Sequence, residues 1–300
     1  MEHEPLNALP PFNLFGVANS SYERARIVVL PVPYDATASY LSGSRFGPSA
    51  IIQASRFIEP FSYELGFDIS KLGIYTMPEL MPDYSSPENM LKSVKKEVLI
   101  LLDENKIPII LGGDHTVSLG ALMAFKEKGT DFSIVQFDAH SDTYEELNAT
   151  RYSHASVIAR ARELYSDVFQ VGIRSIDENY FRKIDKHKTL FIDDIREMGT
   201  KKVGELLKER TKNSIYVTFD FDVLDPSEMP SVGTPEPNGL HFSEILDIFK
   251  ELSKGKLLVG ADFTEFMPIP YLHAPDFEAA KLIYLFMGLF LSKHLKEGKK

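Results

Sequence analysis

Two predicted strands in this sequence run directly into clusters of carboxylates. The apolar run 132–136 leads into Phe-Asp-Ala-His-Ser-Asp at 137–142, and the apolar run 214–218 leads into Phe-Asp-Phe-Asp at 219–222. In an extended chain, the side chains of residues i, i+2 and i+4 project to one side, so each cluster is predicted to point its acids in one direction. Carboxylates crowded at the edge of a core repel one another, and a divalent metal ion is the strongest neutraliser available.

Strand-like and helix-like segments alternate along the whole chain. Apolar runs typical of strands lie at 26–30, 107–111, 168–171, 190–192 and 257–259, and helical patterns lie at 48–57, 86–102, 203–210 and 242–252. Ser86 and Pro87 form a helix start, with the serine as cap and the proline in the first turn. The alternation predicts an α/β fold with a mostly parallel sheet covered on both faces, as a three-layer α/β/α sandwich. A closed barrel would give the same pattern.

Length, charge and cysteine content limit the classes of protein. The chain has 300 residues, a net charge of -10 and no cysteine, which excludes disulfides, thiolate metal sites and cysteine nucleophiles. No linker is visible, so residues 1–300 are predicted to form a single domain. The acidic balance argues against nucleic acid and favours cationic ligands. The N-terminus has no secretory signal and the apolar run 282–291 is too short to cross a bilayer, so a cytoplasmic protein without membrane contact is expected.

A third strand end adds a histidine to the acidic clusters. The run 107–111 leads into Gly-Gly-Asp-His at 112–115, where the glycines permit a tight turn. Ligands of open parallel sheets bind beyond the carboxyl ends of the strands, so the predicted metal ligands are His115, Asp138, His140, Asp142, Asp220 and Asp222. Oxygen outnumbers nitrogen in this set, which favours manganese over a structural zinc ion. The charge of the aspartates is balanced by a pair of divalent ions, so we expect two Mn²⁺ per chain.

The combined motifs closely resemble those of the ureohydrolase family, which includes arginase and agmatinase. The matching stretches are Pro-Val-Pro-Tyr-Asp at 31–35, Gly-Ser-Arg-Phe-Gly-Pro at 43–48, the three clusters at 112–115, 137–142 and 219–226, Gly-Thr-Pro-Glu-Pro at 233–237, and Thr-Glu-Phe at 264–266. The resemblance covers roughly residues 25 to 290 and leaves residues 1–24 as an N-terminal extension.

The resemblance implies a catalytic domain with a roughly eight-stranded sheet and a pair of manganese ions. It assigns one ion to His115, Asp138, Asp142 and Asp220, and the other to Asp138, His140, Asp220 and Asp222, so that Asp138 and Asp220 bridge the ions. The implied reaction is hydrolysis of a guanidinium group to urea and an amine. The resemblance also implies a homo-oligomer, a trimer or a hexamer.

Three residues are candidates for the reaction itself. Asp142 can accept a proton as the reaction intermediate collapses, and Glu265 can pair with a guanidinium through both carboxylate oxygens. His154 matches the proton-shuttle histidine of the family. The alternatives without a role in the reaction are that His154 is only a structural residue at a helix end and that Glu265 forms a surface ion pair.

The substrate tail is the most open part of the interpretation. Glu145 and Glu146 follow the first cluster and would repel a carboxylate but attract an amine, so agmatine, hydrolysed to putrescine and urea in polyamine biosynthesis, is the first choice. Arg151 argues against this, because it could bind a carboxylate, and Asp177 does not discriminate. Aminopropylagmatine, guanidinobutyrate and arginine remain alternatives.

Other classes of protein fit the sequence less well. A nucleotide-binding oxidoreductase should carry Gly-x-Gly-x-x-Gly after a strand, and none occurs here. A metal-dependent deacetylase should need fewer carboxylates around a single zinc ion. A non-catalytic metal-binding relative would not need both His154 and Glu265.

Overall fold

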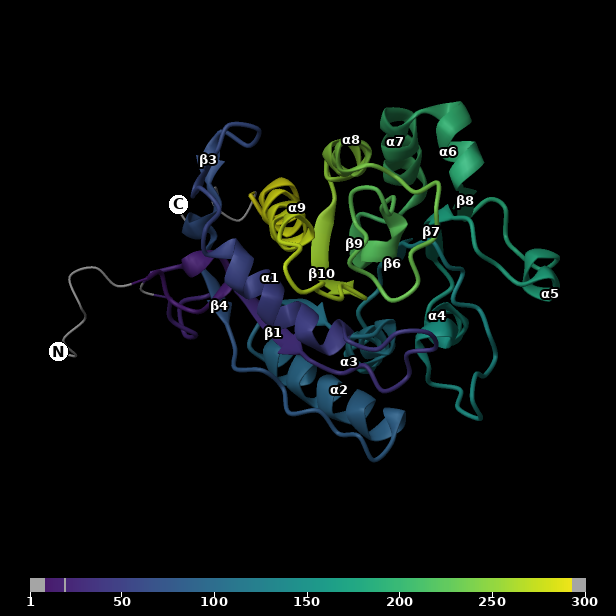
Figure 1. Cartoon of the computed structure of the whole chain (residues 1–300), viewed down its shortest axis with the longest axis horizontal. Helices are drawn as coiled ribbons and strands as arrows, with labels where there is room; N and C mark the ends of the chain where they lie inside the picture. Colours follow the sequence, from purple (N-terminus) through teal and green to yellow (C-terminus); the bar gives the residue numbers. More distant parts are fainter. Residues whose placement is uncertain (1–8, 19, 293–300) are drawn as a thin grey trace.

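The computed structural model describes residues 9–18 and 20–292 and is built around an open sheet of eight strands (Figure 1). The strand order is β4-β1-β5-β10-β9-β6-β7-β8, and all neighbours are parallel. The strands are β1 (Ile27–Val32), β4 (Ile74–Thr76), β5 (Ile107–Gly112), β6 (Ser133–Phe137), β7 (Val168–Ile173), β8 (Thr189–Phe191), β9 (Ser214–Asp220) and β10 (Leu257–Thr264). Because β4 and β8 are free edges, the predicted sandwich is confirmed and the barrel is excluded.

Helices cover both faces of this sheet. One face packs with α2 (Pro87–Asp103), α3 (Ser118–Glu127) and α4 (Val157–Leu164). The other packs with α1 (Gly47–Ser55), α6 (Ile192–Met198), α7 (Thr200–Arg210), α8 (Phe242–Leu252) and α9 (Ala274–Leu291). The short helix α5 (Glu178–Phe181) and the hairpin of β2 (Phe61–Ser62) and β3 (Phe67–Asp68) lie outside these layers.

Local sequence signals explain where several of these elements begin. The Ser86 hydroxyl accepts a hydrogen bond from the Asn89 N–H at 3.2 Å, and Pro87 begins α2, so the predicted cap is confirmed. The apolar run 282–291 lies within α9, and all of its residues but Leu289 are buried. Within the described ranges, no helix combines the length and the apolar character that crossing a membrane requires.

The two acidic clusters leave the extended conformation in a way that the sequence did not predict, the first after Phe137 and the second after Asp220. β6 ends at Phe137, and Asp142 has a positive φ of 49°. Asp222 lies in a 3-10 turn, Phe221–Val223, that follows β9. The expectation that the side chains converge through a continued extended backbone is therefore wrong. Hydrogen bonds to the neighbouring connection that follows β7 bend the chain instead, for example from the Ser141 N–H to the Ser175 carbonyl at 3.2 Å.

Candidate metal centre

Four neighbouring strands deliver the candidate site residues to one edge of the sheet. In the order β5-β10-β9-β6, the segments that follow these strands, or end them, carry His115, Glu265, Asp220 and Asp138. These residues are far apart in the sequence, but the carboxyl ends of parallel strands meet at the same edge. The crossover topology thus places an imidazole and carboxylates within a few ångströms of one another.

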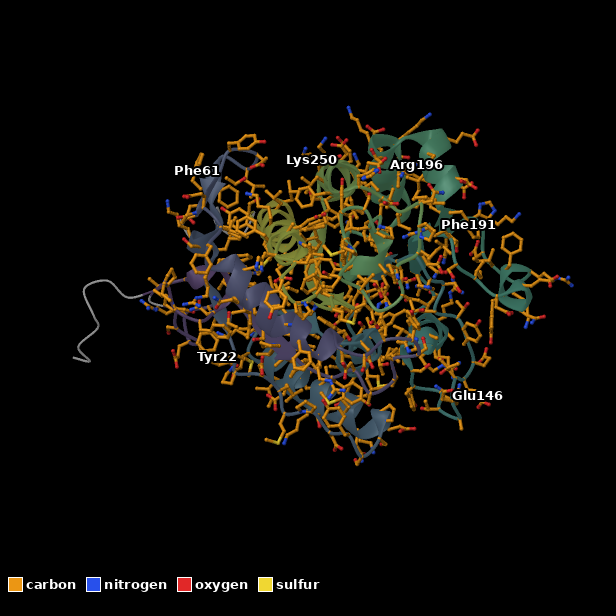
Figure 2. All side chains as sticks on the ribbon, viewed as in Figure 1. Tyr22, Phe61, Glu146, Phe191, Arg196 and Lys250 are labelled. Atoms are coloured by element: carbon orange, nitrogen blue, oxygen red, sulfur yellow. The ribbon has the colours of Figure 1, made fainter. Side chains whose placement is uncertain are left out.

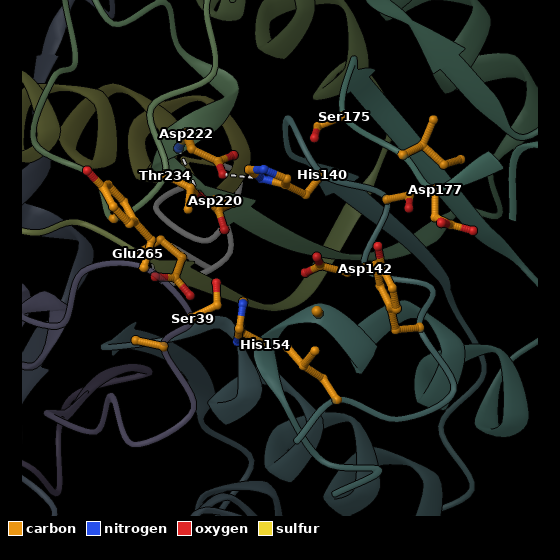
Figure 3. A pocket seen from close by; sticks show the side chains of 18 of the residues that line it. Ser39, His140, Asp142, His154, Ser175, Asp177, Asp220, Asp222, Thr234 and Glu265 are labelled. Atoms are coloured by element: carbon orange, nitrogen blue, oxygen red, sulfur yellow. Dashed lines mark hydrogen bonds and ion pairs between the residues drawn. The ribbon is translucent and has the colours of Figure 1, made fainter. Parts of the chain in front are cut away.

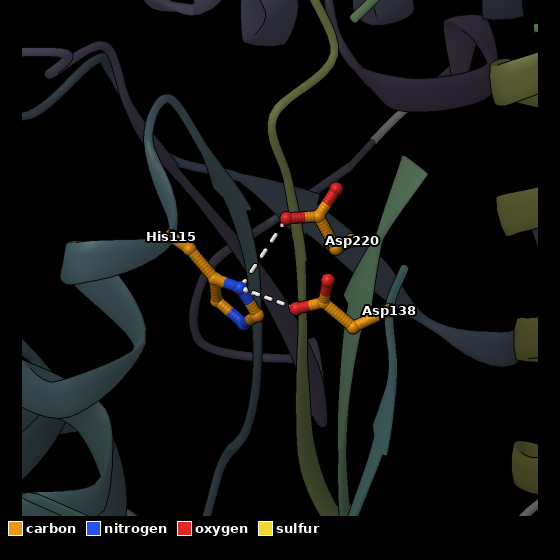
Figure 4. A group of neighbouring side chains, drawn as sticks. All are labelled: His115, Asp138 and Asp220. Carbon is orange, nitrogen blue, oxygen red and sulfur yellow. Dashed lines mark ion pairs between the residues drawn. The ribbon is translucent and has the colours of Figure 1, made fainter. Parts of the chain in front are cut away.

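His115 faces carboxylates from both clusters (Figure 4). Its Nδ1 atom lies 3.1 Å from Asp138 Oδ2, 3.1 Å from Asp142 Oδ2 and 3.3 Å from Asp220 Oδ2. The ring is buried, and this Nδ1 atom has no hydrogen-bond partner of acceptable geometry. A buried nitrogen that points at carboxylate oxygens without bonding to them has the arrangement of metal ligands directed at one cation.

His140 forms a second group that shares Asp138 with the first. Its Nδ1 atom lies 2.6 Å from Asp222 Oδ2 and 3.8 Å from Asp138 Oδ1. Asp138 therefore presents one carboxylate oxygen to each histidine, as a bridging ligand would. The second potential ligand group consists of Asp138, His140 and Asp222. Asp220 belongs to the His115 group alone, so its expected bridging position stays a prediction.

The protonation equilibria of these residues show the electrostatic cost of the cluster. Burial raises the pKa of Asp138 to about 8, and the carboxylates of Asp142 and Asp222 add repulsion. Burial also raises the pKa of Asp220, again with repulsion from Asp222 and Asp138. Burial opposes the charged form of His140, yet Asp222 outweighs it and raises the pKa of that imidazole to about 11. Without a cation, the cluster holds protons at neutral pH.

The residues present fit a divalent metal ion. Their donors are carboxylate oxygens and imidazole nitrogens, the set that suits manganese and related ions. Bound cations would replace the protons that the cluster otherwise retains. His115, Asp138, Asp142 and Asp220 would hold one ion, and Asp138, His140 and Asp222 the other.

A buried polar chain behind His115 sets the tautomer of its ring. Asp262 Oδ1 accepts a hydrogen bond from the Thr218 hydroxyl at 2.6 Å. The Thr218 hydroxyl has one proton, which it donates to Asp262. Its oxygen must therefore accept a hydrogen bond from Nε2–H of His115, 2.7 Å away. This leaves Nδ1 of His115, which faces the carboxylates, as the nitrogen that would bind a cation. Such backing of a ligand histidine orients the ring and is typical of metal sites.

A cleft of about 380 Å³ opens above the carboxylates (Figure 3). It is lined by His140, Asp142, His154, Asp220, Asp222 and Glu265, and also by Ser39, Tyr40, Leu41, Tyr144, Leu147, Ser175, Ile176, Asp177 and Thr234. In Figure 3, Asp177 lies at the side of this group away from Glu265, and we call that side the outer cleft. The structure thus brings all three predicted reaction residues, Asp142, His154 and Glu265, to one cavity beside the candidate metal ligands.

Glu265 is held in a strained conformation at the end of β10. Its φ is 64°, which is uncommon for a residue with a side chain. Its N–H donates to the Gly113 carbonyl at 2.8 Å, and its Oε1 accepts from the His115 N–H at 2.7 Å. Burial raises its pKa well above the ordinary range, with repulsion from Asp114 in addition. A surface ion pair is therefore not the explanation of Glu265, whose carboxylate faces the cleft instead.

The environment of His154 includes residues that the sequence analysis missed. The Thr37 hydroxyl accepts from the His154 N–H at 3.0 Å and lies 3.4 Å from its Nδ1. The buried carboxylate of Asp114 in turn accepts from the Thr37 N–H and hydroxyl, each at 2.9 Å. Asp114 was visible as the third residue of Gly-Gly-Asp-His, but nothing local linked it to residues 37 and 154.

The acidic residues expected to repel a carboxylate do not line the cleft. Glu145 forms an ion pair with Arg160 at 2.7 Å, and Figure 2 shows Glu146 at the periphery of the molecule. Arg151 is exposed and pairs with Glu163 at 2.7 Å. None of these three residues lines the cleft, so none is placed to contact the substrate there. The acid of the outer cleft is Asp177.

Comparison with known proteins agrees with this geometry. The sequence model described as the Arginase family matches residues 25–288. The N(1)-aminopropylagmatine ureohydrolase of Thermus thermophilus is 39% identical over 278 residues, covering 92% of this chain and 94% of that protein. The agmatinase of Bacillus subtilis is 31% identical and covers 85% of this chain and 88% of its own length. The crystal structure of agmatine ureohydrolase of Thermoplasma volcanium matches with a TM-score of 0.85 and 32% identity, covering 97% of each chain.

Proposed function

The chain belongs to the arginase family and is a ureohydrolase, and on this premise we propose that it uses two Mn²⁺ ions to release urea from a guanidino-amine without a carboxylate. The observation that carries the proposal is the composition of the cleft. Aspartates and histidines form the floor of the cleft, and Asp177 lies in its outer part. No lysine or arginine occurs among the described residues that line it. The same premise extends the proposal to a cytoplasmic homo-oligomer that serves polyamine biosynthesis.

The residues of the cleft divide the work of the reaction. When bound, paired divalent ions lower the pKa of water and supply a nucleophile at neutral pH. The Glu265 carboxylate binds the guanidinium group and orients its carbon toward the floor of the cleft. Asp142 accepts a proton during the reaction, and His154 carries a proton between the cleft and the leaving amine.

The outer cleft favours an amine tail over an amino-acid tail. An α-carboxylate placed there would face Asp177 without a cationic side chain from the lining, and burying an unpaired charge is costly. A terminal ammonium can pair with Asp177, and the methylene chain can lie against Leu41, Tyr144 and Leu147. Both agmatine and N1-aminopropylagmatine meet these requirements.

Between these two amines, the relatives favour the longer one. Identity is 39% to the N(1)-aminopropylagmatine ureohydrolase of Thermus thermophilus and 31% to the agmatinase of Bacillus subtilis. The cleft is open to solvent at Tyr40, which lines it and is 73% exposed, so it leaves room for an extended tail. We therefore place N1-aminopropylagmatine, which would yield spermidine, ahead of agmatine, the choice from sequence alone.

A competition assay tests the proposal. Manganese-loaded protein would receive N1-aminopropylagmatine, agmatine, guanidinobutyrate and arginine at equal concentration, and urea and each amine product would be measured. We expect either guanidino-amine to exceed arginine by at least about tenfold in kcat/KM, or about 1.4 kcal/mol of transition-state binding. Arginine or guanidinobutyrate as the preferred substrate would contradict the proposed tail, and agmatine ahead of its aminopropyl derivative would reverse the order within the class.

A further inference from the structure

A continuous row of polar residues crosses the core directly behind the candidate metal ligands. Strand register aligns Asp262 with Thr218, Thr218 with Gln136, Gln136 with Gln170, and Gln170 with Thr189, on the adjacent strands β10, β9, β6, β7 and β8. None of these side chains is more than 1% exposed. We call these five residues the polar row.

On the side away from the candidate metal ligands, the row borders the apolar core. The residues two positions earlier on the three central strands, which share its face of the sheet, are Tyr216, Ile134 and Val168, all buried in the core cluster beneath α2, α3 and α4. Burying amides, hydroxyls and a carboxylate costs free energy unless each is hydrogen-bonded. Polar side chains at these buried positions cost folding free energy that valine or leucine would not. Their hydrogen bonds identify the residues that they hold in place.

One arm of the row ends on Asp138. Arg162 of α4 donates from Nη2 to Gln170 Oε1 at 2.7 Å. Gln170 donates from Nε2 to Gln136 Oε1 at 2.7 Å, and Gln136 donates from Nε2 to Asp138 Oδ2 at 2.6 Å. Gln170 Nε2 also donates to the Ser141 carbonyl at 2.9 Å, in the loop between His140 and Asp142. The arm thus touches both the shared carboxylate and the loop that carries its neighbours.

The guanidinium at the start of this arm determines the direction of every bond in it. Arginine can only donate, so the oxygen of the Gln170 amide must face Arg162 and its nitrogen must face Gln136. The oxygen of the Gln136 amide is then occupied as an acceptor, and its nitrogen must face Asp138. A glutamine amide without such partners can exchange the positions of its oxygen and nitrogen by rotation. The bonds of this arm fix the Gln136 amide, so that its nitrogen donates to Oδ2 of Asp138.

The other arm ends on His115 and has the opposite polarity. Asp262 accepts hydrogen bonds from three hydroxyls, those of Ser118 at 2.9 Å, Tyr216 at 2.7 Å and Thr218 at 2.6 Å. The Thr218 oxygen is left to accept from Nε2 of His115 at 2.7 Å. An obligate donor therefore begins one arm and a buried carboxylate begins the other.

We propose that the two arms form a template that orients the metal centre, with Arg162, Gln170 and Gln136 as positioning residues for Asp138, and with Asp262 and Thr218 as positioning residues for His115. The proposal rests on the metal centre of the proposed function but not on its substrate. A donor held against Oδ2 keeps the Asp138 carboxylate in one rotamer, so that Oδ1 remains directed to the His140 group. Loss of such outer partners of a metal ligand typically weakens metal affinity by about 10- to 100-fold.

The test measures Mn²⁺ binding to full-length variants, by titration calorimetry and by electron paramagnetic resonance of free Mn²⁺. Gln136→Met removes the donor to Asp138 and retains similar volume, and we expect Mn²⁺ to bind about 10- to 100-fold more weakly. Arg162→Met acts at a half-buried helix position remote from the ligands, so it provides a second variant if Gln136→Met fails to fold. Arg162→Lys keeps a donor at that place and should recover part of the affinity.

Thr189→Val is the matched control, because Thr189 belongs to the row but to neither arm, its hydroxyl lying 3.4 Å from Gln170 Oε1. We expect this variant to bind Mn²⁺ as the parent protein does, even if its unfolding midpoint in EDTA is lower. Unchanged affinity in both Gln136→Met and Arg162→Met would overturn the proposal, and so would equal weakening by Thr189→Val. A parent protein that binds Mn²⁺ but releases no urea from any guanidino-amine would contradict the proposed function alone.

Discussion

The floor and the rim of the cleft differ sharply in how they are held. Asp220 on the floor, and Asp138 and His115 beneath it, are at most 3% exposed and lie at the carboxyl-end edge of the central sheet. On the rim, Tyr40 is 73% exposed and Leu41 48%. Packing and hydrogen bonds from every side hold the floor, so its geometry is specified by the whole fold. The rim is held mainly at its base and is therefore freer to vary with the substrate.

The anchoring of the rim loop makes this contrast concrete. Asp114 accepts a hydrogen bond from the Thr37 N–H at 2.9 Å, and Asp35 accepts from the Gly43 N–H at 2.8 Å. These bonds secure both ends of the segment that carries Tyr40 and Leu41, while its tip projects over the cleft. We infer that the floor governs whether the reaction occurs and the rim governs which tail is accepted, and the predictions below test this division from its largest expected effect to its smallest.

Asp138→Asn should abolish activity almost completely. The substitution removes a charge that both histidine groups share, and breaking a buried charge pair costs about 3–5 kcal/mol. Manganese content after loading and urea release would both be measured, with Asp131→Asn as control, because Asp131 precedes the same strand but pairs with Lys212 at the surface. Two tightly bound ions and normal turnover in Asp138→Asn would disprove the assignment of Asp138 as a shared ligand.

His154→Ala should slow turnover by roughly 10²–10⁴-fold and leave metal content unchanged. His154 lies on the floor side of the cleft but belongs to neither potential ligand group, so its loss should affect proton transfer without releasing the ions. Steady-state kinetics and metal analysis separate the two effects, and small imidazoles should restore part of the rate. Full turnover would show that His154 is only structural.

Mn²⁺ affinity should rise with pH. In the metal-free protein, the pKa of Asp138 is about 8 and that of His140 about 11, so both groups are protonated at neutral pH and must lose protons to bind a cation. Between pH 6 and 8, affinity should therefore increase by about tenfold per pH unit for each proton released. Calorimetry in buffers of different ionisation enthalpy counts those protons. An affinity independent of pH would contradict the protonated metal-free cluster.

Asp177→Asn should weaken the use of guanidino-amines by about tenfold in kcat/KM, since hydrogen bonds to charged groups contribute about 1.5–3 kcal/mol. The effect should fall mainly on KM, because Asp177 lies at the outer end of the cleft. Metal content should stay unchanged, and a guanidino compound without a terminal amine should lose little. Equal losses of kcat/KM for substrates with and without a terminal amine would show that Asp177 affects the reaction at the floor. That result would contradict the division between floor and rim.

Tyr40→Ala should have the smallest effect, about a 2- to 5-fold rise in KM, because an exposed contact between an aromatic ring and a cation contributes about 0.5–1 kcal/mol. We expect a larger change for N1-aminopropylagmatine than for agmatine, since the longer tail reaches further along the rim. Tyr40→Phe is the matched control and should behave as the parent protein. A lower kcat in Tyr40→Ala would show that the rim also affects the reaction.

Much of the fold follows from local patterns. The Ser86-Pro87 cap, the apolar strands and the order of elements predicted a parallel α/β sandwich, and the structure confirms it. The acids at 138–142 and 220–222 were also visible, because strand, turn and carboxylates are consecutive. The extended path expected for those acids was wrong, since hydrogen bonds to distant loops bend the chain after Phe137.

Sequence alone determined the family, the fold class and the candidate ligands, because each depends on residues that are adjacent or regularly spaced. Tertiary structure decided which distant groups act together. Gln136 and Gln170 are visible as polar residues in apolar strands, but only strand register places them in a row with Thr218 and Asp262. Likewise, only the tertiary structure shows that Glu145 pairs with Arg160 and that Asp177 lines the cleft. Charge effects depend on distance and burial, and neither is encoded in local spacing.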